Sequence, residues 1–282
     1  MSVPLPLETR SIVDPMSSPG PEVTVPTFTA ITPRYAPPPL TPTPHPRWVE
    51  SLLDATRRDW DEACWPPLFR DTADGLRPPL FHWRRVLSQF FLIVESFPKY
   101  MGLSLAKTTY GQSPGDASIR RWLLQNLGVE AKHAEWFIDW VRAIGVAPES
   151  LFRLRPLPEV QALHAHLLDT CTHGTLAEGV AASNWAIESI TGVWTREVME
   201  PFRSYAEDGV RIDATSMMWL KAHARYDDLH PVEALEIIKL STDPRGDEPV
   251  RVLAATRKSL RLYTAALRAC CAEERTRTTL AR

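Results

Sequence analysis

Apolar residues recur at helical spacing over nearly all of the chain after Arg47, and this pattern constrains the fold more than any other feature. They lie three or four residues apart, as on one face of an α-helix, and no stretch sustains the alternation of a β-strand. The pattern predicts helices over residues 48–60, 78–105, 116–145, 159–172, 175–205, 213–230, 231–241 and 247–278. We therefore predict an all-α fold, with a break or kink at Pro98.

The prolines divide the chain into two parts. Of 26 prolines, 13 lie between Pro4 and Pro46, where serine and threonine are also common and apolar residues are few. Such a segment cannot bury enough apolar surface to offset the entropy lost on ordering. We predict a disordered Pro-rich tail over residues 1–46 and one helical domain over residues 47–282. A ligand for a proline-recognising module is the alternative for the tail.

Charge, hydropathy and cysteine usage exclude several classes of protein. A net charge of −2 disfavours a nucleic-acid partner, because phosphate neutralisation needs a concentrated basic face. The longest apolar run, Phe90–Val94, is far too short to cross a membrane. The N-terminus lacks the features of a secretory signal, and the four cysteines show no Cys-x-x-Cys spacing. We therefore expect a reduced, cytoplasmic protein without membrane contact.

Carboxylates and imidazoles interrupt the apolar faces of three predicted helices. Glu130 and His133 are three residues apart and share one face of a helix turn. Glu188 lies mid-helix among apolar residues, where an unpaired charge would be costly. The third set follows the spacing i, i+4 and i+7 on one helix face. The six candidate metal ligands are Glu130, His133, Glu188, His223, Asp227 and His230.

This set of ligands favours iron. Carboxylates can bridge two metal ions, and imidazoles favour iron over magnesium or calcium. A structural zinc site would be rich in cysteine. Di-iron helical bundles place a Glu on each of two helices and a Glu-x-x-His pair on each of two others. The series of Glu95, Glu130-x-x-His133, Glu188 and Asp227-x-x-His230 nearly matches this formula. We predict a non-haem site with two iron ions per chain.

Over residues 80–242 the sequence resembles the haem-oxygenase-like di-iron oxidases and oxygenases, iron-containing redox enzymes related to the TenA and PQQ-synthesis folds. The resemblance rests on Glu130-x-x-His133, on Glu188, and on His223-x3-Asp227-x2-His230 followed by Pro231-Val-Glu-Ala-Leu. It implies a single haem-oxygenase-like bundle of about seven core helices and iron ligands at those six positions. It also implies O₂ activation for the oxidation of amino acids or fatty acids.

The predicted function is therefore an O₂-dependent di-iron oxidase or oxygenase acting on a small amino acid in a biosynthetic pathway. The outcome would be desaturation, C–C cleavage, cyclisation or N-oxygenation. One alternative is the desaturating decarboxylation of a medium-chain fatty acid. Alternatives of another class are a ferritin-like redox protein and a metal-free TenA-like hydrolase or binding module. An external electron donor and a homodimer are further expectations, besides O₂ and the small-molecule substrate.

Other polar residues have competing interpretations. Glu95 could be a further ligand, could accept a hydrogen bond from a ligand, or could be a polar residue near the Pro98 kink. Cys171 fits the nucleophile of a TenA-type hydrolase poorly, because nothing at the right spacing would activate it. His164, His166 and His173 are expected at the surface. The candidate pocket residues are Trp122, Asn126, Phe137, Asn184, Trp185 and Trp219.

Overall fold

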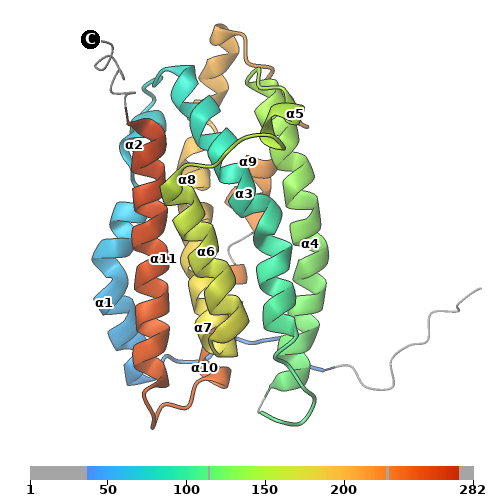
Figure 1. Ribbon diagram of the computed structural model, residues 1–282, viewed down its shortest axis with the longest axis vertical. Helices are drawn as coiled ribbons and strands as arrows, with labels where there is room; N and C mark the ends of the chain where they lie inside the picture. Colours follow the sequence, from blue (N-terminus) through green and yellow to red (C-terminus); the bar gives the residue numbers. More distant parts are fainter. Residues whose placement is uncertain (1–36, 114, 227–228, 273–282) are drawn as a thin grey trace, which may run out of the picture. The chain divides into compact units, whose positions relative to one another are not determined.

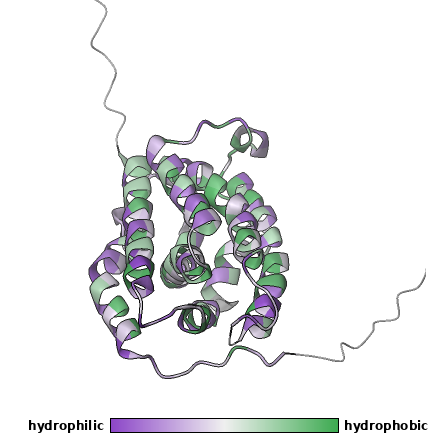
Figure 2. Ribbon diagram, turned by 60° about the horizontal axis from the view of Figure 1, so that its bottom comes forward, coloured by the Kyte–Doolittle hydropathy of each residue, from purple (hydrophilic) through white to green (hydrophobic). Residues whose placement is uncertain are grey.

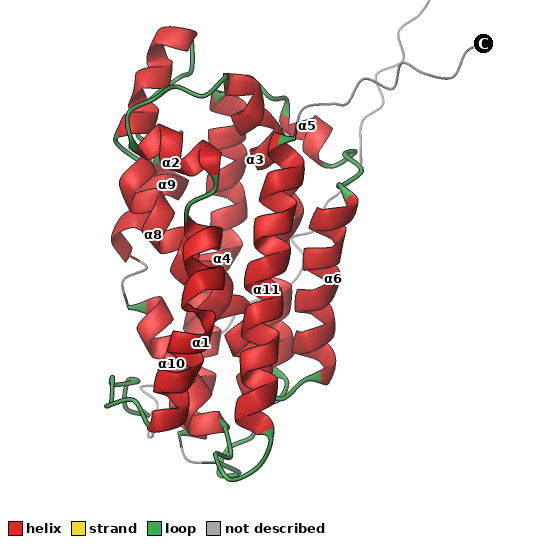
Figure 3. Ribbon diagram, turned by 90° about the vertical axis from the view of Figure 1, so that its left-hand side faces the viewer, coloured by secondary structure: helices red, strands yellow, loops and turns green. Residues whose placement is uncertain are grey.

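A computed structural model describes residues 37–113, 115–226 and 229–272, without the side chains of residues 225 and 226. Every regular element within these residues is a helix, and no strand occurs among them (Figure 3). The all-α prediction is confirmed. None of the described helices combines the length and the apolar character needed to cross a lipid bilayer.

Five long helices form the frame of the bundle (Figure 1). Helix α3 packs along α4, and α11 lies between α1 and α6. All are amphipathic, so each turns an apolar stripe towards the interior. The five are α1 (Arg47–Cys64), α3 (Leu80–Leu105), α4 (Asp116–Ala143), α6 (Pro158–His173) and α11 (Glu248–Cys271).

Shorter helices complete the bundle. They are α2 (Pro67–Ala73), α5 (Pro148–Leu151), α7 (Leu176–Val180), the π-helix η1 (Ala181–Glu188), α8 (Ser189–Val198), the 3₁₀-helix η2 (Pro201–Asp208), α9 (Met218–Tyr226) and α10 (His230–Ser241). The segment predicted as one helix over residues 175–205 is thus interrupted by η1. Helix α3 continues through Pro98 instead of ending there, because a single missing N–H removes only one hydrogen bond of a long ladder.

Two apolar cores fill the bundle, which Figure 2 shows from below with its helices around a common interior. The larger core contains most of the aromatic rings, among them Trp83, Trp140 and Phe202. The smaller core includes Met101 and Ile119. Four of the polar residues predicted from sequence line a pocket together with members of the larger core; they are Glu130, His133, Glu188 and His223.

Residues 37–46, which the sequence assigns to the tail, lie against the bundle without forming a helix. The Thr43 backbone N–H and hydroxyl donate hydrogen bonds to the two carboxylate oxygens of Glu236, at 2.9 and 2.8 Å. Lys239 Nζ donates to the Thr43 carbonyl at 2.7 Å, and Arg121 donates to the Pro37 carbonyl at 2.8 Å. The final ten residues of the predicted tail are therefore bonded to the helical unit, while residues 1–36 lie outside the described part.

Candidate metal centre

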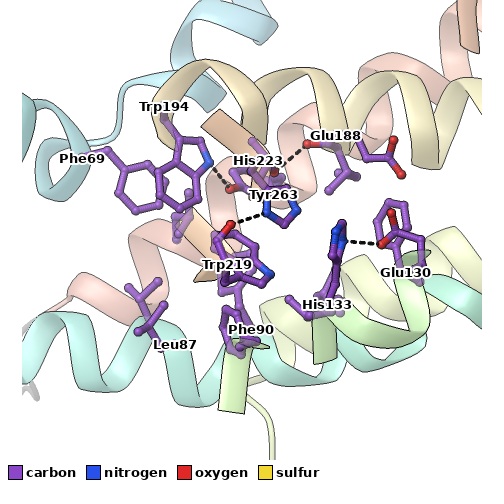
Figure 4. Close-up of a pocket in the computed structure, with 18 of the residues that line it drawn as sticks. Phe69, Leu87, Phe90, Glu130, His133, Glu188, Trp194, Trp219, His223 and Tyr263 are labelled. Carbon is purple, nitrogen blue, oxygen red and sulfur yellow. Dashed lines mark hydrogen bonds and ion pairs between the residues drawn. The ribbon is translucent and has the colours of Figure 1, made fainter. Parts of the chain in front are cut away.

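Four polar side chains from three segments of the fold gather at one end of an apolar pocket (Figure 4). Glu130 and His133 come from α4, Glu188 from the end of η1, and His223 from α9. We refer to these four residues as the donor cluster. Each is between 3% and 6% exposed, although charged and polar groups are costly to bury. The fold therefore brings together candidate ligands that the sequence places far apart.

Glu130 and His133 lie on one turn of α4. His133 Nδ1 and Glu130 Oε2 are 2.9 Å apart, and the carboxylate can only accept in this bond. The imidazole therefore carries its proton on Nδ1, which leaves the lone pair of the neutral ring on Nε2. The i, i+3 spacing predicted that both side chains share one helix face, and the structure shows that they do.

His223 faces His133 across the pocket, with 4.6 Å between the ring centroids. Its Nδ1 donates to the Trp219 carbonyl at 2.8 Å, so the neutral ring again has its lone pair on Nε2. Burial lowers the pKa of His223 well below its ordinary value, and the nearby His133 lowers it further. A buried neutral imidazole with a fixed tautomer is the form that binds a metal ion.

Glu188 ends the π-helix, a rare geometry that occurs preferentially at functional sites. The Asn184 amide, four residues earlier and fully buried, donates to Glu188 Oε1 at 2.8 Å. A hydrogen bond of this kind fixes the orientation of a carboxylate before it binds a ligand. Glu188 also lies at the boundary between η1 and α8, where the helix geometry changes.

Of the remaining two candidate ligands, the structure describes only His230. His230 is the first residue of α10 and is partly buried, with its ring 5.9 Å from that of Trp122. Burial lowers the pKa of His230, while the neighbouring carboxylates Glu130 and Glu233 oppose that shift. His230 thus lies near the donor cluster. Asp227 is outside the described residues, so its role stays a prediction.

The chemical types of the donor set fit iron. Among the described residues, no three His, Cys, Asp or Glu side chains converge closely enough to hold a metal ion. The donors that approach one another are two carboxylates and three imidazoles, without cysteine. Such a mixed oxygen and nitrogen set suits iron better than calcium, magnesium or a structural zinc ion.

The pocket next to the donor cluster is narrow and almost entirely apolar, with a volume of about 60 Å³. Figure 4 shows the donor cluster at one end and Phe69 and Leu87 at the other, with Tyr263 and Trp194 between. Trp194 donates its indole N–H to the Tyr263 hydroxyl at 3.2 Å. The described residues that line the pocket include no lysine or arginine. An organic molecule bound here would meet polar groups mainly at the donor cluster.

The candidate pocket residues divide into two groups. Phe137 and Trp219 line the pocket as expected. The others lie outside its lining and play different roles. Asn184 holds Glu188, Asn126 donates to a carbonyl of its own helix at 3.1 Å, and Trp122 donates to Glu233 at 2.6 Å. Trp185 packs at the edge of the smaller core.

The structure does not bring Glu95 to the donor cluster. Its carboxylate is 2.8 Å from Lys99 Nζ, and it lines a separate surface groove. Cys171 is fully buried outside the pocket lining, and burial raises the pKa of its thiol, which is the opposite of what activates a nucleophile. All four cysteines are free.

The expectation of surface histidines holds for His173 but is wrong for His166. His166 is 7% exposed because it lies on the inner face of α6, within hydrogen-bonding distance of the Ala255 carbonyl and the Thr170 hydroxyl. His164 is partly exposed, and its Nδ1 is 2.7 Å from the Tyr100 hydroxyl.

Sequence reasoning missed most of the pocket wall. The missed residues from α3 recur at helical spacing, and this period is the signal that could have identified them as one inner face. They are Trp83, Val86, Leu87, Phe90, Ile93, Val94 and Phe97. Phe69, Trp194 and Tyr263 come from three other helices, so no local pattern links them to the site.

Comparison with known proteins agrees with this fold. The model of a family described as iron-containing redox enzymes matches residues 84–264. A 4-aminobenzoate synthase from Chlamydia trachomatis is 25% identical over 175 residues, which cover 61% of this chain and 71% of the relative.

Solved structures show the same architecture. A TenA homologue from Pseudomonas syringae pv. tomato is 32% identical, with a TM-score of 0.74, and the match covers 83% of this chain and 99% of that one. A domain of unknown function with a haem-oxygenase-like fold from Shewanella denitrificans is 20% identical, with a TM-score of 0.64 and coverage of 79% and 91%. The predicted haem-oxygenase-like bundle is thus confirmed.

Proposed function

Because this chain belongs to the family of iron-containing redox enzymes, we propose that it oxidises a small organic molecule with O₂ at a non-haem iron site. One observation carries the proposal. Two carboxylates and two imidazoles from three segments of the chain are buried together at the polar end of an apolar pocket. A purely structural role would not require four ionisable groups there, since apolar residues would pack at lower cost.

The proposed ligands are the donor cluster together with His230, and Asp227 as the sixth. Two carboxylates and a third from Asp227 would balance the charge of two iron ions. Bound iron would supply the electrons and the open coordination positions through which O₂ is activated. The chain's own contribution is to orient these ligands: the Trp219 carbonyl holds His223, and Asn184 holds Glu188.

The pocket suits a small substrate with one polar end. Because the lining lacks a cation, a substrate carboxylate would bind at the iron site, and its apolar remainder would extend towards Phe69 and Leu87. A small amino acid with a short apolar side chain satisfies both demands. The relative named 4-aminobenzoate synthase supports chemistry on amino acids, because the compound in its name is itself an amino acid. A medium-chain fatty acid is the second candidate, since apolar walls suit its chain.

Two other classes are less well supported. A TenA-like hydrolase would need an activated thiol, whereas burial raises the pKa of Cys171. A ferritin-like redox protein would not need an apolar pocket for an organic substrate beside its iron ligands.

Metal analysis and O₂ consumption test the proposal. Protein loaded anaerobically with iron(II) should hold two iron ions per chain, and His223→Ala should hold fewer. His166→Ala is the matched control, because it removes an equally buried imidazole outside the pocket. Amino acids and fatty acids are then compared for the O₂ consumption that they stimulate. Equal iron in His223→Ala, His166→Ala and wild type, or the absence of iron from all three, would refute the proposal.

A further inference from the structure

Three tryptophans form a continuous series of ring contacts that starts at the proposed ligand His223. The ring of Trp219 is 3.9 Å from the His223 ring, centroid to centroid. Trp140 stacks on Trp219 at 5.3 Å with an interplanar angle of 20°, and Trp83 follows at 5.8 Å. We call Trp219, Trp140 and Trp83 the indole relay. Each of the three is at most 4% exposed.

The indole relay continues towards the surface at η2. Phe202 is 5.2 Å from Trp83, and Tyr205 is 5.1 Å from Phe202, again between ring centroids. The Tyr205 hydroxyl donates to the Pro78 carbonyl at 2.6 Å. Glu207, two residues further along η2, is exposed and 2.7 Å from Arg77. A series of aromatic contacts thus runs from the donor cluster to Tyr205, which is 1% exposed and lies two residues from the exposed Glu207.

Packing alone does not account for the choice of tryptophan in this series. A buried tryptophan usually finds a partner for its indole N–H. Among the residues that the structure describes, the Nε1 atoms of all three relay tryptophans are buried without a hydrogen-bond partner. Phenylalanine would fill much of the same space without that cost. What the indoles add is chemical, since tryptophan and tyrosine lose an electron far more readily than phenylalanine.

We propose that the indole relay carries single electrons inward from the η2 surface to the iron site. This inference rests on the proposed function. When iron has been oxidised by O₂ and no substrate supplies the electron, Trp219 gives up one electron. Trp140, Trp83 and finally Tyr205 replace it in turn. Tyr205 is 1% exposed, so an external thiolate at the η2 surface gives one electron to the oxidised Tyr205 without touching it and becomes a thiyl radical. The phenolic proton that Tyr205 releases with its own electron passes to solvent, and one proton returns from solvent when the phenol is re-reduced.

The test measures where the chain is oxidised. Iron-loaded protein is cycled with O₂ and dithiothreitol in the absence of substrate, and oxidised residues are located by peptide mass spectrometry. Wild type should show oxidation at Trp83 and Tyr205, at the outer end. Trp140→Phe interrupts the relay, so oxidation should shift severalfold towards Trp219 and the pocket. Re-reduction of iron by the thiol, followed optically, should also slow severalfold.

Trp65→Phe is the matched control, because Trp65 is a partly buried tryptophan at the edge of the same core, outside the relay. Trp83→Phe is the second interruption if Trp140→Phe does not fold. The relay would be overturned if Trp140→Phe showed the same oxidation pattern and re-reduction rate as Trp65→Phe. The proposed function would still stand in that case, provided that the protein binds iron and responds to substrate. Failure of the wild type to bind iron would overturn both.

Discussion

Replacing Asn184 by alanine should weaken iron binding without removing any proposed ligand. The Asn184 amide is fully buried and donates to Glu188 Oε1 at 2.8 Å. A hydrogen bond to a charged group contributes about 1.5–3 kcal/mol, which corresponds to about 10- to 150-fold in an equilibrium constant. Loss of a partner that orients a metal ligand costs about 10- to 100-fold in metal affinity. The two ranges agree, so we expect iron to bind about 10- to 100-fold more weakly.

The assay is an anaerobic titration with iron(II) in competition with a chromogenic chelator. Asn126→Ala is the matched control, because Asn126 is also buried, at 8% exposure, but donates to the Trp122 carbonyl of its own helix. This control should reduce stability and leave iron affinity unchanged. Asn184→Asp should bind iron no more tightly than Asn184→Ala does. It replaces the donor to Glu188 with a second carboxylate, which repels Glu188 instead of orienting it. Equal iron affinity in Asn184→Ala and Asn126→Ala would show that orientation of Glu188 does not matter.

Three further outcomes follow from the contacts outside the pocket. Thr43→Val should lower the free energy of unfolding by about 1 kcal/mol in a denaturant titration, because it removes a bond to the buried Glu236, whereas exposed Thr41→Val should not. Burial lowers the pKa of His166 in the folded chain. As the pH falls, the unfolded chain therefore binds a proton at His166 at a higher pH than the folded chain does. Stability should therefore fall as the pH drops below about 6.5, and more gradually in His166→Gln, as followed by thermal unfolding. Removal of residues 1–36 should leave iron content unchanged by metal analysis, and loss of iron would contradict the prediction.

The sequence predicted those parts of the site that depend on local helix geometry. The i, i+3 relation of Glu130 and His133 survives in any straight helix, so their shared face on α4 needed no knowledge of tertiary packing. The apolar period also predicted the long helices, because burial of one face determines where they form. The cytoplasmic location, the homodimer and the external electron donor stay predictions.

The position of Glu95 around the axis of α3, by contrast, directs its side chain away from the site. Trp83, Phe90 and Phe97 line the pocket at intervals of seven residues, and Glu95 comes two residues before Phe97. Each residue turns an α-helix by about 100°, so Glu95 lies about 200° away from that face. The di-iron formula includes Glu95 because of its order in the chain, and order alone carries no information about the direction in which a side chain leaves the helix. Trp194 and Tyr263 were missed for a different reason, because only tertiary packing brings α8 and α11 together.

The π-helix η1 joins two helices whose inward faces belong to different cores. Ala177 and Val180 of α7 pack in the smaller core, while Ile190 and Trp194 of α8 pack in the larger one. Hydrogen bonding from i to i+5 takes up more chain per turn than an α-helix does, so it resets the angle between these faces. Deleting one residue from η1 could restore an ordinary α-helix and at the same time rotate Glu188 by about 100° relative to α7. The π-helix therefore sets the rotation of α8 relative to α7. In the variant with a regular helix, the Glu188 carboxylate would point away from His133 and His223.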